Sequence, residues 1–166
     1  MQEINSLDIS KIFAGNNNYG GTYARDEIPE DLDRRHKFYM INLDSKSGPG
    51  THWTCCFNCR PDTVYYFDSF GAPPPEMLLS EMKQTGKEIH FNGIQIQNLS
   101  SIMCGYYCID VLRQLNAGKS FKNILSGYSD DTNTNEKMII EYAVKQRIQG
   151  GGSVLTNKIY CCVKAK

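Results

Sequence analysis

The sequence predicts a single α+β domain with a central mixed, mostly antiparallel sheet flanked by helices. The chain has 166 residues, of which 40% are hydrophobic, so its length and composition suit one domain with a buried core. Strand-like segments follow one another early in the chain without an intervening helix, and later segments have helical spacing. The resulting order, α-β-β-β-α-β-α-α-β, lacks the strict strand–helix alternation of a doubly wound sheet.

The elements are predicted from local patterns along the chain. Strands are expected where alternating, β-branched and aromatic residues gather, at residues 37–44, 51–59, 63–70, 87–97 and 154–163. Helices are expected where apolar residues recur at helical spacing between stop signals, at residues 6–15, 76–83, 103–115 and 135–149. Two connections stand out, a loop at 16–21 and a charged, solvated stretch at 25–37.

The domain boundary is expected at a run of glycines near the C-terminus. Residues 1–149 form the main domain, and residues 150–166 form a glycine-rich hinge and the terminal strand, which can be part of the same domain.

Charge and cysteine content exclude several classes of protein. Eighteen basic residues balance eighteen acidic ones, which argues against a nucleic-acid binder that works by bulk electrostatics. No apolar run approaches the roughly 18 residues of a membrane helix, and the N-terminus lacks a signal-peptide pattern. The seven cysteines are therefore expected in a reducing compartment as free thiols, with a disulfide framework as the weaker alternative.

A histidine and an aspartate are predicted to face each other in a hairpin. Residues 51–59 and 63–70 flank a turn-like stretch, and a loop centred on Arg60 sets His52 directly opposite Asp68. Their β carbons are then about 4.5–5.5 Å apart, so the carboxylate can orient the imidazole. On these two residues alone, an acid–base pair and an ordinary cross-strand polar pair both remain open.

A cysteine begins the helix predicted at residues 103–115. In the first turn, the helix dipole and a neighbouring imidazole favour the thiolate form of Cys104. Gly105 leaves room beside the sulfur for a substrate backbone. Gln97 can donate a side-chain N–H to an oxyanion together with the backbone N–H of Cys104. The alternative is that Cys104 is a small buried hydrophobe.

Together these residues resemble the adenovirus-type cysteine endopeptidases and the wider clan that includes the SUMO-deconjugating proteases. The matching pieces occur in the same chain order, and they are His52-Trp53 after a glycine-containing turn, the motif YFDSFG at 66–71, and Gln97 placed seven residues before Cys104-Gly105.

The resemblance implies that residues 1–149 are a cysteine protease domain. Cys104 would attack the scissile carbonyl, and His52 would act first as base and then as acid. Asp68 would orient His52, and Gln97 with the Cys104 backbone would form the oxyanion hole. Trp53 would pack beside His52. No metal is implied.

The resemblance also suggests a biological setting. The deconjugating enzymes usually carry an aspartate just before the nucleophile, whereas this chain has Met103, which favours the viral maturation branch found also in virophages and related mobile DNA elements. That branch implies capsid or scaffold precursors as substrates, a monomer, and a location in the virion and at the assembly site of the host cell. The neutral charge speaks against DNA as a cofactor, and no cofactor is required by the sequence.

The C-terminal tail contains a possible cleavage site. The family favours cleavage after an apolar residue, any residue and two glycines, and residues 148–151 with Gly152 after them match that pattern. Self-cleavage between Gly151 and Gly152 is therefore a hypothesis, and the basic strand beyond it can replace the activating peptide of the adenovirus enzymes. The alternative is a plain glycine hinge before an ordinary last strand.

Two rival functions remain open. One is a ubiquitin-like or SUMO-type deconjugating protease. The other is a zinc-stabilised interaction module that uses Cys55, Cys56 and Cys59 with Cys161 or Cys162. Strand alternation points Cys55 and Cys59 to one face and Cys56 to the other, which disfavours a shared metal. His36 and His90 are expected to be structural or solvated.

Overall fold

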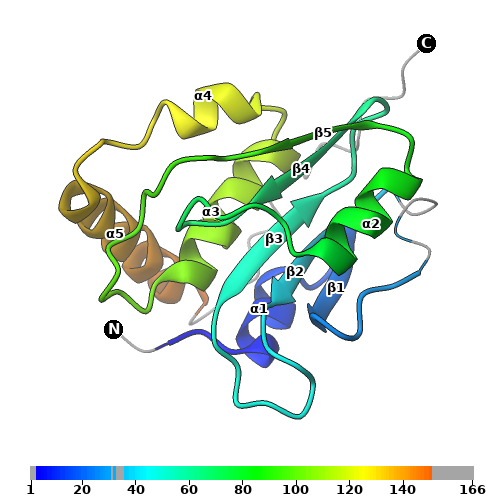
Figure 1. Ribbon diagram of the computed structural model, residues 1–166. Coiled ribbons are helices and arrows are strands. Elements are labelled where there is room, and N and C mark those ends of the chain that lie inside the picture. Colours follow the sequence, from blue (N-terminus) through cyan, green and yellow to red (C-terminus); the bar gives the residue numbers. More distant parts are fainter. Residues whose placement is uncertain (1–2, 31, 33–35, 151–166) are drawn as a thin grey trace.

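The computed structural model describes residues 3–30, 32 and 36–150. These residues form a single α+β domain in which a mixed sheet is flanked by helices (Figure 1). The hinge and terminal strand were expected at residues 150–166. Gly150 is instead the last residue of the helix Thr132–Gly150, and residues 151–166 lie outside the described residues.

The sheet has five strands in chain order, namely β1 (Tyr19–Ala24), β2 (Phe38–Asn42), β3 (Trp53–Phe57), β4 (Thr63–Phe67) and β5 (Glu88–Phe91). The central pairings of β3 with β2 and β4 are antiparallel, whereas β1 and β5 run parallel to their neighbours. Antiparallel pairing is thus confined to the centre of a mixed sheet, where short connections link successive strands.

The helices are α1 (Ser6–Ile12), α2 (Glu76–Gln84), α3 (Cys104–Asn116), α4 (Phe121–Leu125) and α5 (Thr132–Gly150). Side chains cap three of them: Asn5 and Asp8 form a reciprocal capping box on α1, Ser120 accepts the backbone N–H of Asn123 in α4, and Asp131 accepts the backbone N–H of Asn133 in α5. No helix within the described residues has the length and apolar character needed to cross a bilayer.

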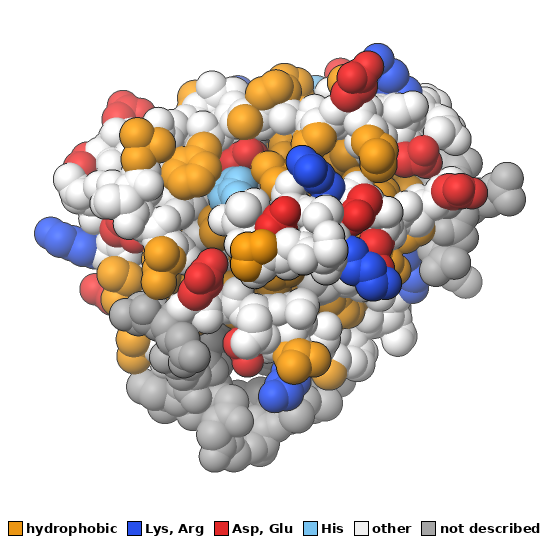
Figure 2. Space-filling view, turned by 60° about the horizontal axis from the view of Figure 1, so that its bottom comes forward, with side chains coloured by type: hydrophobic (Ala, Val, Ile, Leu, Met, Phe, Trp, Pro, Cys, Tyr) orange, Lys and Arg blue, Asp and Glu red, His pale blue; other side chains and the backbone are white. Residues whose placement is uncertain are grey.

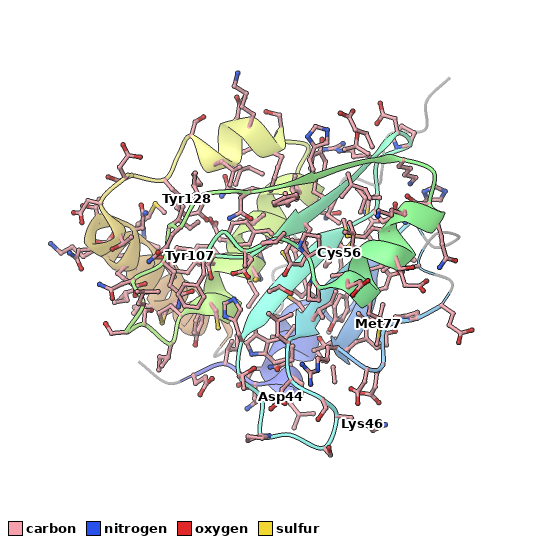
Figure 3. The ribbon with its side chains drawn as sticks, in the orientation of Figure 1. Asp44, Lys46, Cys56, Met77, Tyr107 and Tyr128 are labelled. Carbon is pink, nitrogen blue, oxygen red and sulfur yellow. The ribbon has the colours of Figure 1, made fainter. Side chains whose placement is uncertain are left out.

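Strand alternation produces a core on each face of the sheet. On one face, Met40, Cys55 and Phe67 pack with α1, α3, α4 and α5. On the other face, Cys56 and Tyr66 pack against α2. Figure 3 shows Cys56 close to α2. Helix α3 belongs to the first of these cores, and every residue in its first turn and a half is buried.

Several predicted elements differ from the structure. The loop expected at 16–21 contributes to an edge strand, β1. This strand was not predicted because glycine has a low propensity for strands. Gly20 is required there because a β carbon would lie 2.2 Å from the Tyr39 ring. The short helix α4 was not predicted. The connection at 25–37 is not wholly solvated, because Leu32 is fully buried in the core beneath α2.

Candidate active site

The predicted site residues lie at one end of the sheet. His52 immediately precedes β3, Asp68 immediately follows β4, and α3 begins with Cys104. The backbone N–H of Trp53 donates to the Cys104 sulfur at 3.4 Å, and the Cys108 thiol donates to the Trp53 carbonyl at 3.3 Å. The start of α3 is therefore held against the start of β3.

The hairpin register differs from the prediction by two residues. Cys55 lies opposite Phe67, whereas a loop centred on Arg60 would set it opposite Tyr65. A shift of two residues keeps each side chain on its face, because side chains alternate with a period of two. His52 and Asp68 therefore still meet, with 2.8 Å between Nε2 and Oδ1. The predicted register, which set His52 directly opposite Asp68, was wrong. The predicted contact between the two side chains is present.

Charge and burial at His52 act in opposite directions. Burial lowers the pKa of His52, while hydrogen bonds to Asp68 and Cys104 and the negative charges of both groups raise it, to about 9 in balance. The side chains of His52 and Asp68 are only 13% and 2% exposed, so water screens this interaction weakly. The imidazole is thus poised to carry a positive charge beside the sulfur.

An aromatic ring that the sequence reasoning did not assign covers His52. The ring of Phe70 stacks on the imidazole with 4.7 Å between centroids and 27° between planes. The family resemblance assigned this place to Trp53, but consecutive residues along an extended chain point to opposite sides. Figure 2 shows a histidine side chain among hydrophobic side chains on the face turned forward.

Trp53 and Gly105 have a different role from the one expected. The indole N–H of Trp53 donates to the carbonyl of Ile4 at 3.1 Å. A β carbon on Gly105 would lie 2.2 Å from Ile4 Cγ2 and 3.1 Å from Trp53 Cδ1. The space beside Gly105 is therefore filled by the N-terminal segment and is not open to a substrate backbone. Ile4 was missed because a lone isoleucine near a terminus carries no sequence signal.

This packing predicts that Gly105→Ala lowers the free energy of unfolding by about 1–3 kcal/mol, the usual cost of overpacking. The matched control is Gly93→Ala, because a β carbon at Gly93 meets nothing within 4 Å. Denaturant unfolding measures both variants. Adding Ile4→Ala to Gly105→Ala should recover part of the loss, and equal stability of the Gly105 and Gly93 variants would contradict this packing.

Gln97 is buried and links the Asp68 turn to the loop that precedes Cys104. Its Nε2 donates to the carbonyl of Ser101 at 2.9 Å, and its Oε1 accepts the Ser69 hydroxyl at 2.5 Å. An amide nitrogen carries two N–H groups. Cys104 is the first residue of α3, so its backbone N–H has no acceptor within the helix.

Within the part of the chain that the structure describes, the remaining cysteines and histidines do not form a group of metal ligands. Cys55 and Cys59 lie in one core and Cys56 in the other, as strand alternation predicts. Across residues 3–30, 32 and 36–150, no three His, Cys, Asp or Glu side chains form a group that could hold a metal ion. Cys161 and Cys162 lie outside the described residues. His90 is exposed and pairs with Glu88, whereas His36 contacts Lys87.

A hollow of about 440 Å³ lies elsewhere, between α3, α4 and α5. Asp110, Tyr128 and Tyr142 contribute to its lining, and none of the predicted site residues does. Figure 3 labels Tyr128 at this end of the molecule.

Comparison with known proteins identifies a fold. No family model and no curated protein sequence matches the chain. One crystal structure of the ASFV pS273R protease matches with 18% identity and a TM-score of 0.51, covering 64% of this chain and 52% of that one. The Se-Met form matches with 22% identity and a TM-score of 0.45, covering 55% and 39%. The chain spans about half the length of that protease, with which it shares its fold.

Proposed function

We propose that this chain is a cysteine endopeptidase of the viral maturation type, with Cys104 as nucleophile, His52 as general acid–base and Asp68 as the orienting acid. One observation carries the proposal: His52 bonds Asp68 through Nε2 at 2.8 Å, and the backbone N–H of Trp53, the residue next to His52, donates to the Cys104 sulfur at the start of α3 at 3.4 Å. The shared fold with a viral protease is compatible with it.

The arrangement supports a two-step hydrolysis. The Cys104 sulfur attacks the scissile carbonyl carbon while its proton resides on His52, and the carbonyl oxygen becomes an oxyanion. The backbone N–H of Cys104 and the Gln97 amide stabilise that oxyanion. His52 returns the proton to the leaving amine, which departs and leaves a thioester. A water molecule, deprotonated by His52, then releases the acid and regenerates the thiol.

Asp68 defines the orientation of the imidazole in this mechanism. Because Nε2 is engaged by the carboxylate, Nδ1 is the nitrogen that serves the sulfur. The backbone N–H of Trp53, 3.4 Å from the sulfur, offers a further donor to a thiolate. Trp53 thus supports the nucleophile through its backbone.

The proposed substrates are capsid or scaffold precursor proteins cleaved at Gly-Gly sites. Cys104 is only 5% exposed, so a chain without side chains at the scissile bond reaches the sulfur most easily. Deconjugation of a ubiquitin-like or SUMO-type protein is the alternative, since those proteins also end in glycines. We propose that the protein acts as a monomer in the virion and at the assembly site, without DNA, membrane or metal.

Labelling with a thiol-reactive electrophile tests the proposed nucleophile. Cys104 is expected to react faster than the other six cysteines, and His52→Ala should slow that reaction while leaving the remaining labelling unchanged. Cys104→Ala identifies the labelled site, and His90→Ala is the matched histidine control because His90 is exposed and distant in sequence. If Cys104 is labelled at the same rate in the unsubstituted protein and in His52→Ala, the proposal is wrong.

Substrate assays distinguish the two kinds of protease. Cleavage of Gly-Gly capsid-type peptides with no action on ubiquitin-like fusions supports the maturation enzyme, and the opposite result supports a deconjugase. The intact mass of the unsubstituted protein and of Cys104→Ala also tests cleavage between Gly151 and Gly152. A tail that stays intact in both excludes self-processing.

A further inference from the structure

We propose that Asn92 is a positioning residue for Asp68, and that it acts by extending the β4–β5 ladder with its side chain. This inference rests on the proposed function of the His52–Asp68–Cys104 group. No local sequence pattern points to a role for Asn92, which lies in the strand predicted at residues 87–97.

The sheet ends just where Asp68 is needed. The last paired residues of the parallel strands β4 and β5 are Tyr66 and Phe91. Beyond them, the Asn92 side chain takes the place of a strand: its Oδ1 accepts the Asp68 N–H at 3.0 Å, and its Nδ2 donates to the Asp68 carbonyl at 2.5 Å. The amide therefore satisfies both backbone groups of Asp68.

Because these hydrogen bonds are buried, losing them should cost stability and displace Asp68. Asn92 and Asp68 are each only 1% exposed, so water cannot replace the lost partners if the amide is removed. Nδ2 also donates to the Ile94 carbonyl at 3.2 Å, which fixes the amide itself. The backbone of Asp68 is thus held to its own neighbour strand by a side chain with a defined orientation.

The turn after Asp68 fixes the position of the Asp68 carboxylate relative to its backbone. The Phe70 N–H donates to Asp68 Oδ1 at 2.8 Å, the same oxygen that bonds His52. The Gly71 N–H donates to the Asp68 carbonyl at 2.8 Å, and Gly71 has a φ of +77°. A β carbon there would lie 2.6 Å from the Ile94 backbone, so this turn packs directly on the segment that follows Asn92.

The same segment holds Gln97. The Ser69 carbonyl accepts the N–H groups of Ile96 and Gln97 at 2.9 and 3.1 Å, and the Ser69 hydroxyl donates to Gln97 Oε1. One buried network therefore links the proposed acid to the proposed oxyanion donor. Removing the Asn92 amide should therefore affect the position of Asp68 more directly than that of Gln97.

Asn92→Ala tests the inference, with Asn58→Ala as the matched control. Asn58 is also fully buried, and outside the site its amide donates to the Leu32 carbonyl and accepts from Lys87. Both variants should lower Tm. Only Asn92→Ala should lower the pKa of His52 from about 9, by roughly one unit or more, and slow Cys104 alkylation at neutral pH. The ionisable groups that face His52 are Asp68 and Cys104.

The pKa of His52 is read from its imidazole NMR signals, and alkylation is followed across pH. If Asn92→Ala does not fold, Asn92→Ser, which keeps a polar group, is measured in the same way. An unchanged pKa and alkylation profile with a lowered Tm would show that Asn92 is structural only. Absence of accelerated Cys104 alkylation in the unsubstituted protein would instead refute the proposed function, so the two failures are distinguishable.

Discussion

His52→Ala is expected to reduce kcat/KM for peptide cleavage by roughly 10⁴-fold or more, because residues of such a group act as a unit. The loss should appear mainly in kcat, since His52 acts on protons in the transition state and its side chain is only 13% exposed to solvent. Cys104→Ala should remove turnover to a similar or greater extent. Steady-state kinetics on a Gly-Gly peptide measures both.

The controls separate chemistry from stability. His90→Ala removes an exposed histidine that pairs with Glu88, and Cys56→Ala removes a buried thiol on the opposite face of the sheet. Both should keep kcat within a few-fold of the unsubstituted value. Retention of most activity in His52→Ala would contradict its assignment as the acid–base group.

Asp68→Asn is expected to move the pKa of His52 well below 9 and to change how stability depends on pH. Asp68 raises that pKa by a hydrogen bond and by its negative charge, while burial lowers it. Without the charge, burial is opposed by Cys104 alone, and the imidazole loses its proton at lower pH. Activity should fall by roughly 10²–10⁴-fold, the range for acid–base groups.

The sign of the pH effect follows from linkage. A histidine whose pKa is raised in the folded state stabilises the protein fully below its ordinary value of 6.5. That contribution disappears as pH rises through the folded-state value of about 9. Tm of the unsubstituted protein should therefore fall between these two pH values, and Asp68→Asn should show a smaller fall. Asp62→Asn, an exposed carboxylate in the β3–β4 turn, is the matched control. Parallel Tm curves for all three proteins would rule out a charged His52–Asp68 pair.

Much of the fold could be predicted because its signals are local. The alternation in residues 51–59 correctly separates Cys55 and Cys59 from Cys56, and helical spacing predicts α3 to within a residue at each end. The edge strand β1 could not be predicted, because Gly20 and Gly21 disfavour a strand. Gly20 admits the ring of Tyr39, and Gly21 admits the ring of Tyr23 and has a φ of +135°. A local sequence pattern does not show which segments of the chain approach each other closely in the fold.

The candidate site divides in the same way. His52, Asp68 and Cys104 were selected by residue type, order and spacing, and the structure brings them together at one end of the sheet. Phe70, Ile4 and Asn92 were missed as site residues because phenylalanine, isoleucine and asparagine occur throughout ordinary cores and loops. Their importance arises from what they contact.

The sequence by itself determined which chemical groups are available and that His52 and Asp68 share a face of one hairpin, because a strand's period of two survives a register shift of two residues. Only the tertiary structure decided how those groups are oriented. The Asn92 amide holds Asp68, Phe70 covers His52, and Ile4 fills the space beside Gly105. These contacts join residues from distant parts of the chain, and their geometry depends on packing that no local pattern encodes.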